Sequence, residues 1–299
     1  MIGSIPAADV SIEPELVRAL LTDQHPDLAS LPLADAGGGW DNNVYRLGEN
    51  LAVRLPRRAA AASLIEHEQR WLPELASRLP LPIPVPLRIG RPGRGFPWSW
   101  SVVAWLPGRP AMIAPPDDPA LAAVELGAFV AALHRPAADD APSNPLRGVP
   151  LASRTETVYE RVSQLEGILD GAAVLALWNR LAETPRWSGS PLWVHGDLHP
   201  GNLLVNGGRL SAVIDFGDLT AGDPATDFSI AWTLLPPPAQ SIFRESARGA
   251  GGSIDDDTWM RARGWALLFG LIFLGTSREH ELMARLGRAT IEAVFANRD

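Results

Sequence analysis

The sequence contains neither cysteine nor lysine. Without cysteine, the chain can form no disulfide, no thiolate metal site and no thiol nucleophile. All 26 basic residues are arginine. Any site that needs a cation must therefore use a guanidinium, which offers a fork of N–H donors where lysine offers a compact point charge.

Long apolar runs and an excess of basic charge are also missing. The longest apolar run, residues 265–275, is too short to span a bilayer and predicts a buried helix. The net charge is −8, whereas nucleic-acid phosphates require a basic stripe. Residues 1–10, which include Pro6 and Asp9, do not resemble a charged-then-apolar leader. We therefore expect a cytoplasmic protein with no nucleic-acid or membrane partner, and the oligomeric state stays open.

One polar string stands out from this background. Residues 195–202 read HGDLHPGN, and residues 215–218 read DFGD. Asp197, Asn202 and Asp215 follow the order that phosphoryl transfer needs: a carboxylate to orient the acceptor hydroxyl, then an amide and a carboxylate to hold Mg²⁺. Short apolar runs at 192–194 and 203–205 place these residues at strand ends. Asp and Asn in such loops commonly only shape turns, but the complete string favours a catalytic loop.

The string resembles the catalytic core of the aminoglycoside phosphotransferase family, which are small-molecule kinases with a protein-kinase-like fold. Gly196 stands where protein kinases carry arginine, and this favours the small-molecule branch. The resemblance implies an α+β, bilobal fold. Residues 1–107 would form an N-lobe with an antiparallel sheet and a helix, and residues 108–299 a mainly helical C-lobe. Helical patterns in the C-lobe cover residues 155–169, 172–182, 238–248, 255–277 and 278–297.

The resemblance also implies roles within the string. Asp197 would orient the acceptor hydroxyl and accept its proton, while Asn202 and Asp215 would hold Mg²⁺. His199 occupies the place of a catalytic-loop lysine of protein kinases, where it would contact the transferred phosphoryl group; the alternative is a hydrogen bond within the turn. Two further residues are expected to support the loop, namely His195 and Asp227.

A glycine cluster near the N-terminus is a candidate nucleotide cradle. Gly37, Gly38 and Gly39 precede an alternating strand that ends at Leu47, and a turn then leads to a return strand over residues 51–55. Glycines let backbone N–H groups approach phosphates. Such a cluster alone is usually a flexible loop, but ahead of the catalytic string it favours a phosphate cradle. Asn42 either donates to phosphate or shapes the turn.

Arg54 takes the position of the family's phosphate-binding lysine. The string RLPR at residues 54–57 resembles the corresponding string of the macrolide phosphotransferase branch. A guanidinium can bridge two phosphate oxygens, although a charge in mid-strand can also simply face solvent. The family pairs this base with a glutamate on the next helix, here residues 59–72. Glu68 is the better match and Glu66 the alternative.

Residues 79–87 alternate proline with aliphatic residues, which excludes a central strand and indicates an extended linker or an edge. Residues 98–106 form the next expected strand. In the family this stretch is the hinge whose backbone amides hold the purine. The hinge candidates are Ala104, Trp105 and Leu106.

These inferences predict an ATP- or GTP-dependent O-phosphotransferase that moves the γ-phosphate to a hydroxyl of a small molecule. The resemblance implies an antibiotic acceptor, a macrolide or an aminoglycoside. Acids and arginines are balanced beyond residue 230 and aromatic residues are present, which suits a bulky, partly apolar acceptor at least as well as a polycation. One alternative is a metabolite kinase for an amino alcohol, a homoserine-like compound or a sugar. Another is a nucleotide-binding regulator without turnover, which only the missing lysine supports.

Overall fold

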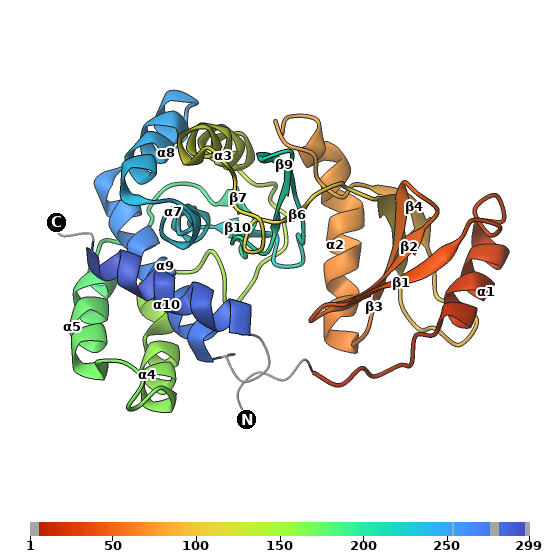
Figure 1. Ribbon diagram of the computed structural model, residues 1–299, viewed down its shortest axis with the longest axis horizontal. Coiled ribbons are helices and arrows are strands. Elements are labelled where there is room, and N and C mark those ends of the chain that lie inside the picture. The colour runs from red at the N-terminus through yellow and green to blue at the C-terminus, as the bar shows by residue number, and fades with distance from the viewer. Residues whose placement is uncertain (1–5, 253, 276–280, 297–299) are drawn as a thin grey trace.

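The structure is a computed structural model that describes residues 6–252, 254–275 and 281–296. It has two lobes, a smaller one built on a sheet and a larger, mainly helical one (Figure 1). The chain runs from the last strand of the N-lobe sheet to the first strand of the C-lobe through residues 105–108. The predicted α+β, protein-kinase-like architecture is confirmed.

The N-lobe is a five-stranded antiparallel sheet in the order β1-β2-β3-β5-β4. Its elements are α1 (Pro14–Gln24), β1 (Leu33–Gly38), β2 (Asn42–Leu47), β3 (Leu51–Pro56), α2 (Ala59–Ala76), β4 (Pro86–Gly90) and β5 (Trp100–Ala104). Alternation places Leu47, Val53 and Val102 in an apolar core beneath α1. The hairpin β2–β3 confirms the predicted strand and its return strand.

The N-lobe begins with α1 and β1. Helix α1 starts at Pro14, because proline at the first helical position fixes a helical φ. The Ser11 hydroxyl donates to Glu13 and caps nothing. The predicted strand after the glycine cluster is β2, and the structure adds the strand β1, which was not predicted and which includes Gly37 and Gly38. The sequence Leu33–Gly38 (LADAGG) lacks β-branched and aromatic residues and therefore gives little strand signal.

The proline-rich segment, residues 79–87, joins α2 to β4 within the N-lobe, in agreement with the predicted extended linker or edge. It leads into β4, which lies at the edge of the sheet, where proline costs no ladder hydrogen bond. The Pro82 carbonyl accepts a hydrogen bond from the Val213 amide of the C-lobe at 3.0 Å. A backbone contact between the lobes therefore forms beside the catalytic segment.

The C-lobe surrounds two small sheets with helices. The sheets have the orders β6-β8-β9 and β10-β7, and both lie against the helical core (Figure 1). The strands are β6 (Arg109–Pro110), β7 (Leu192–Val194), β8 (Leu203–Asn206), β9 (Arg209–Val213) and β10 (Thr220–Gly222). The helices are α3 (Pro119–Leu133), η1 (Leu151–Arg154), α4 (Thr155–Gln164), α5 (Gly171–Ala182), α6 (Ala225–Phe228), α7 (Ile230–Leu234), α8 (Pro237–Gly249), α9 (Asp256–Gly275) and α10 (Glu281–Ala296).

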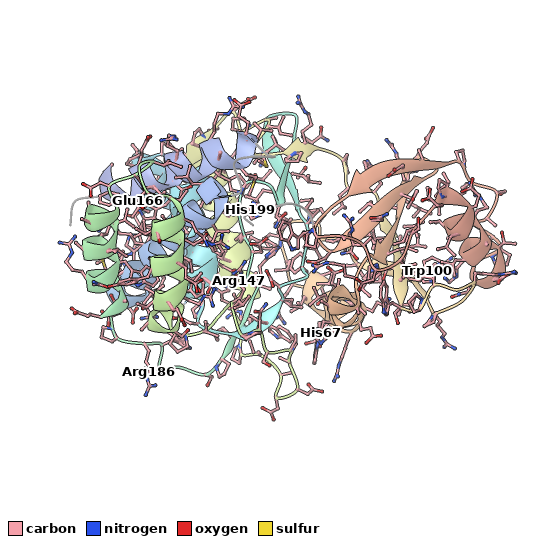
Figure 2. The ribbon with its side chains drawn as sticks, turned by 90° about the horizontal axis from the view of Figure 1, so that it is seen from below. His67, Trp100, Arg147, Glu166, Arg186 and His199 are labelled. Carbon is pink, nitrogen blue, oxygen red and sulfur yellow. The ribbon has the colours of Figure 1, made fainter. Side chains whose placement is uncertain are left out.

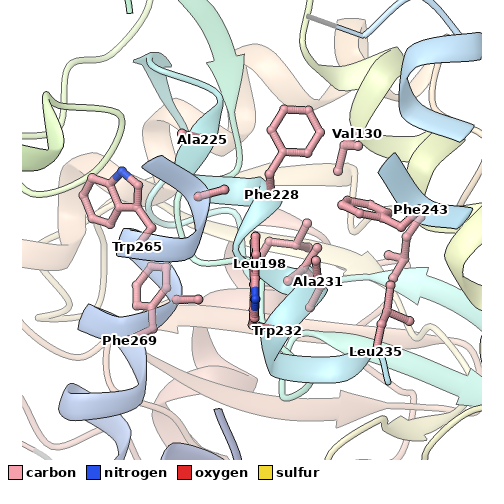
Figure 3. Packing of buried hydrophobic residues seen from close by; sticks show 14 of the residues in the cluster. Val130, Leu198, Ala225, Phe228, Ala231, Trp232, Leu235, Phe243, Trp265 and Phe269 are labelled. Carbon is pink, nitrogen blue, oxygen red and sulfur yellow. The ribbon is translucent and has the colours of Figure 1, made fainter. Parts of the chain in front are cut away.

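The apolar run at 265–275 forms the buried part of α9, as predicted. Figure 3 shows Trp265 and Phe269 of this helix in the same core as Leu198, which belongs to the catalytic string. The fully buried Leu198 side chain thus anchors that loop from below. Within the described residues, no helix is both long and apolar enough to cross a membrane. The predicted helices over 255–277 and 278–297 extend in part into residues 276–280 and 297, which lie outside the described residues.

Candidate active site

The HGDLHPGN string lies between β7 and β8, and its backbone conformation requires glycine at its second position. Gly196 has φ of 86°, a left-handed value that side chains with a Cβ rarely adopt. A Cβ at Gly196 would also collide with the carbonyl oxygen of Asp218. Glycine at this position therefore allows the loop to pack directly against the DFGD segment.

Two residues hold this loop from below, as the sequence predicted. The Asp227 carboxylate is fully buried and accepts hydrogen bonds from the His195 amide at 2.8 Å and the Gly196 amide at 2.9 Å. It also contacts Nε2 of His134 at 3.0 Å. The ring Nε2 of His195 lies 3.0 Å from the Ile214 carbonyl oxygen, which ties the loop to the segment before Asp215. These contacts position the loop and leave Asp197 facing the cavity.

Asp197 is held by neighbours on its own loop. The Asn202 amide nitrogen donates to the Asp197 carbonyl at 2.9 Å and lies 3.3 Å from its carboxylate Oδ2. Nε2 of His199 lies 3.3 Å from the same Oδ2. Nδ1 of His199 accepts from the Gly201 amide at 3.0 Å, so in the neutral ring the proton resides on Nε2 and points to Asp197. The turn hydrogen bond foreseen as the alternative role of His199 is thus present.

Arg147 is a residue of this site that the sequence did not reveal. Its Nη2 lies 3.5 Å from Oδ1 of Asp197, and its Nε lies 3.4 Å from Oδ2 of Asp218. Its guanidinium stacks over Phe269 at 5.0 Å, and Figure 2 shows it in the C-lobe with His199. Arg147 lies in a proline-rich loop that contains no recognisable motif. Its sequence neighbours therefore do not indicate that the folded chain brings it into contact with Asp197.

The basic groups around Asp197 govern its ionisation. Burial alone would raise the pKa of this carboxyl, but His199 and Arg147 outweigh burial and hold the pKa well below its usual range. Burial dominates at Asp218, where it raises the pKa despite the Arg147 charge. Asp197 is therefore the carboxylate of this pair that stays ionised most readily.

Asn202 and Asp215 line the same cavity as Asp197. Asp215 has φ of 62°, uncommon for a residue other than glycine or asparagine, and such strain is often found at functional sites. In the described part of the chain, no group of three or more His, Cys, Asp and Glu side chains could hold a metal. Mg²⁺ is commonly bound by one or two protein ligands together with substrate phosphates and water. One carboxylate and one amide oxygen at the cavity wall fit that pattern.

The structure pairs Arg54 with Glu68. Nη2 of Arg54 donates to Oε1 of Glu68 at 3.1 Å, and Nη1 donates to Oε2. Both residues are buried, at 8% and 1% exposed. Glu66 instead accepts from the Ser99 hydroxyl at 3.0 Å on the exposed side of α2, so the alternative pairing does not occur. Burial alone lowers the pKa of Arg54, but the Glu68 and Asp215 carboxylates raise it above its usual value, which places this cation beside the catalytic segment.

The glycine turn uses most of its own amides. The Gly37 amide donates to the Asp35 carboxylate and the Gly39 amide to the Asn42 carbonyl, each at 2.8 Å. The side-chain oxygen of Asn42 is buried and has no hydrogen-bond partner among the described residues. Gly38 pairs with Asn43 at the end of the β1–β2 ladder. The turn therefore has a fixed shape before any nucleotide binds.

Asp41 at the tip of this turn was also not foreseen. It lines the cavity, and Nη2 of Arg58 donates to its Oδ1 at 2.6 Å. Burial raises the pKa of Asp41, an effect that Arg58 opposes. The turn thus presents an ion pair, rather than bare backbone, toward Asp197 and Asp215.

The hinge candidates differ in how free their amides are. The Trp105 amide donates to the Asn50 carbonyl at 2.8 Å, and its ring lies under the Arg46 guanidinium at 4.8 Å. Ala104 pairs with Leu51 at the end of β5. The Trp105 amide is thus already bonded within the N-lobe. Leu106 follows both of these pairings along the chain, toward the C-lobe.

A cavity of about 560 Å³ brings together the predicted residues of the catalytic string and Asp215, but the residues that line it do not include Arg54, Glu68, the three glycines, Asn42 or the hinge candidates. One side carries Asp197, His199 and Asn202. The other side is formed by α4, α9 and α10 of the C-lobe. The rings of Phe269 and Phe273 stack at 5.8 Å and lie beneath Arg147 and His199 respectively. The cavity is large enough for a small-molecule acceptor beside the catalytic carboxylate.

The fold and this constellation define a kinase-like phosphotransferase that acts on small molecules. Residues 33–265 match the model of a family described as "Phosphotransferase enzyme family". The chain belongs to this family, and the predictions of the family and of a phosphotransferase enzyme are confirmed.

Solved structures with the same fold have low sequence identity to this chain. The GDP complex of wild-type aminoglycoside 2'-phosphotransferase-IIIa is 20% identical, and the match covers 96% of this chain and 100% of that one with a TM-score of 0.70. Macrolide 2'-phosphotransferase MphH from Brachybacterium faecium is 21% identical, with 95% and 99% covered and a TM-score of 0.65. The uncharacterized protein YcbJ of Bacillus subtilis (strain 168) is 31% identical over 83 residues, which are 26% of this chain and 27% of YcbJ. At such identities the solved structures establish the fold alone.

Proposed function

We propose that this protein transfers the γ-phosphate of ATP or GTP to a hydroxyl group of a small molecule. The observation that carries the proposal is the convergence of Asp197, Asn202 and Asp215 on one cavity. Across from them, the buried Arg54–Glu68 pair reaches toward Asp215 from the N-lobe. Phosphoryl transfer requires this combination of an acceptor-orienting carboxylate, metal ligands and a phosphate-binding cation.

Asp197 orients the acceptor hydroxyl and takes its proton as the new oxygen–phosphorus bond forms. Its low pKa makes it a weak base, which suits a loose transition state in which the hydroxyl loses its proton late. Positioning is then the main contribution of Asp197, and the hydrogen bonds from Asn202 and His199 fix the carboxylate for that task.

Arg54 binds the nucleotide phosphates. Glu68 holds two of its five N–H groups, which fixes the guanidinium plane and leaves further donors for phosphate oxygens. Asn202 and Asp215 would hold Mg²⁺, which when bound supplies positive charge against the phosphates. Gly37, Gly38, Gly39 and Asn42 would close over the triphosphate, and Ala104, Trp105 and Leu106 would flank the base. Similar structures are described with GDP and with ATP, and we propose either triphosphate as the donor.

The acceptor proposed from the family is an antibiotic. Similar structures are described as complexes with kanamycin and with gentamicin, and others are macrolide phosphotransferases. Phe269, Ile272 and Phe273 give the cavity an apolar wall, which favours a bulky, partly apolar acceptor over a polycation. A metabolite kinase is the second candidate, because arginine side chains line the same cavity.

The test is phosphoryl transfer itself. Purified protein with Mg²⁺ and ATP or GTP is incubated with macrolides, aminoglycosides, amino alcohols, homoserine and sugars, and mass spectrometry detects the phosphate adduct. We expect an adduct on one acceptor class, and Asp197→Asn should lower the rate of its formation by at least about a hundredfold. The control is Asp139→Asn, an exposed carboxylate away from the cavity. Undiminished transfer by Asp197→Asn would refute the assigned role, and nucleotide binding without transfer to any acceptor would favour the regulator.

A further inference from the structure

The acceptor cavity carries its charges in two separate groups. Among the described residues that line it, the carboxylates are Asp41, Asp197, Asp215 and Asp218. All four come from the β1–β2 turn or from the catalytic segments. The segment that follows the Arg147 loop, in contrast, contributes only basic and neutral side chains, namely Arg154, Thr157 and Arg161. The cavity is therefore acidic at its catalytic end and basic at the α4 wall.

Three carboxylates of the catalytic end, Asp41, Asp197 and Asp218, already have basic partners. Arg58 is paired with Asp41. Arg147 lies between Asp197 and Asp218. These two arginines are thus neutralised within the protein. They do not account for the charge at the α4 wall.

The arginines of the α4 wall lack such neutralisation. Thr157 and Arg161 follow the i, i+4 spacing on α4, which places them on one helix face, and Arg154 is the last residue of η1, directly before α4. Within the described residues, neither arginine forms an ion pair with a carboxylate; Arg161 donates only to the neutral Gln164 side chain at 3.2 Å. Nε of Arg154 is buried and has no hydrogen-bond partner in the described structure.

This arrangement is electrostatically unfavourable without a ligand. Burial lowers the pKa of the Arg154 guanidinium, and the neighbouring Arg147 charge lowers it further. Arg154 is half-buried, and a partly desolvated charge gains from a bound counter-ion. The residues Phe269, Ile272 and Phe273, which line the same cavity, are apolar and offer no carboxylate. Among the described residues no carboxylate pairs with Arg154 or Arg161, and an anionic ligand would supply that counter-charge.

We propose that Arg154 and Arg161 bind an anionic group of the acceptor, a carboxylate or a phosphate. This inference rests on the proposed function, because it assigns the acceptor of the same site. The acceptor then has three parts: a hydroxyl beside Asp197, an apolar body against Phe269 and Phe273, and an anion at the α4 wall. A polycation is repelled from that wall, so the inference favours an anionic acceptor of the metabolite-kinase candidate over aminoglycosides and macrolides, which carry amino groups and neither a carboxylate nor a phosphate.

The test uses a matched set of acceptors that differ only in charge. These are ω-hydroxyalkanoic acids of four to twelve carbons, their methyl esters, the amino alcohols of equal length, and hydroxyalkyl phosphates as the second anion. Transfer from Mg²⁺-ATP or Mg²⁺-GTP is measured by mass spectrometry and by steady-state kinetics. We expect kcat/KM for at least one anion to exceed that of its neutral ester by about tenfold or more. Equal values for the acid and its ester, or a preference for the amine, would overturn the inference.

Arg154→Gln should bring the acid-to-ester ratio of kcat/KM close to one, mainly by raising KM for the acid by about 10- to 100-fold. Arg154→Lys should restore part of the preference, because it returns a cation without the fork of donors. Arg180→Gln on the exposed face of α5 is the matched control and should keep the ratio. If Arg154→Gln does not fold, as judged by circular dichroism, Arg161→Gln carries the same test. An unchanged ratio in the folded variant would overturn the inference.

Failure of the proposed function has a different signature. If neither these acceptors nor the macrolides, aminoglycosides, homoserine and sugars gain phosphate, the transferase proposal is contradicted, and calorimetry then decides the anion site separately. The acids and esters are titrated into Asp197→Asn with bound nucleotide. Tighter binding of the acid supports the anion site, and equal binding of both overturns it.

Discussion

Removing Arg54 tests the central electrostatic feature of the N-lobe. The pair Arg54–Glu68 is almost fully buried and joined by two hydrogen bonds. Deleting one partner of a buried pair leaves an uncompensated charge and typically costs about 3–5 kcal/mol. Arg54→Met should therefore lower the free energy of unfolding by about that amount near neutral pH. The double variant Arg54→Met/Glu68→Leu removes both charges and should lie within about 1–2 kcal/mol of the wild type.

The pH dependence of Arg54→Met supplies a second check. Burial already raises the pKa of Glu68, and Arg54 opposes that shift. Without Arg54 the folded-state pKa rises further above the unfolded value, so the folded state binds the proton more tightly. The stability of the variant should then fall as pH rises from the usual value of 4.5 through the raised pKa. The loss relative to wild type is accordingly small near pH 4 and largest above the raised pKa.

Equilibrium unfolding in urea measures these differences, with coincident fluorescence and circular dichroism transitions required before a two-state fit is used. Arg54→Lys retains a cation but not the forked geometry, and we expect a loss of about 1–2 kcal/mol together with weaker nucleotide binding. The reasoning is refuted if Arg54→Met costs less than about 1 kcal/mol near neutral pH. It is also refuted if the double variant loses the sum of the two single losses, since this would mean that the charges are not coupled.

Two further predictions concern the catalytic loop. The folded-state pKa of Asp197 lies below its usual value of 3.8. The ionised carboxylate therefore stabilises the folded state above pH 3.8, and this stabilisation is lost as the pH falls from 3.8 toward the folded-state pKa. Below pH 3.8 the free energy of unfolding of the wild type should fall by up to about 1.4 kcal/mol per pH unit more than that of Asp197→Asn. Equilibrium unfolding at a series of acid pH values measures this difference, and parallel pH profiles of the two proteins would contradict the prediction. Gly196→Ala places a Cβ on left-handed backbone and against the Asp218 carbonyl oxygen. The variant should lose at least about 1–2 kcal/mol of unfolding free energy and should not transfer phosphate. Thermal unfolding confirms that the variant is folded in the assay, and turnover at the wild-type rate would show that the loop can move.

Parts of the site could be predicted because they are encoded locally. Asp197, Asn202 and Asp215 follow one another in a short stretch bounded by apolar strands, so their order alone indicates phosphoryl transfer chemistry. Arg54 and Glu68 come from consecutive elements, and their pairing followed from the family pattern. The roles of the site residues remain predictions that the proposed assays address.

The predictions for the glycine turn and the hinge identified the segments but not the hydrogen bonds within them. The glycine cluster indicated a phosphate-binding turn, but it did not indicate that the amides of Gly37 and Gly39 donate to Asp35 and Asn42. Candidate hinge amides were found without knowing that Asn50 accepts from Trp105. A hydrogen bond between residues far apart in sequence leaves no periodic or compositional signal, because either residue alone is compatible with many partners.

The sequence by itself determined the class of the enzyme, the order of its catalytic groups and the amphipathic elements that carry them, since spacing and periodicity are properties of neighbouring residues. Only the tertiary structure decided that Arg147 reaches Asp197, that Asp41 and Arg58 face the same cavity, and that Arg154 lies there with its Nε unpaired among the described residues. These residues lie on segments far apart along the chain. Their charges act on one another through space, and the folding of each lobe sets the distances within these pairs.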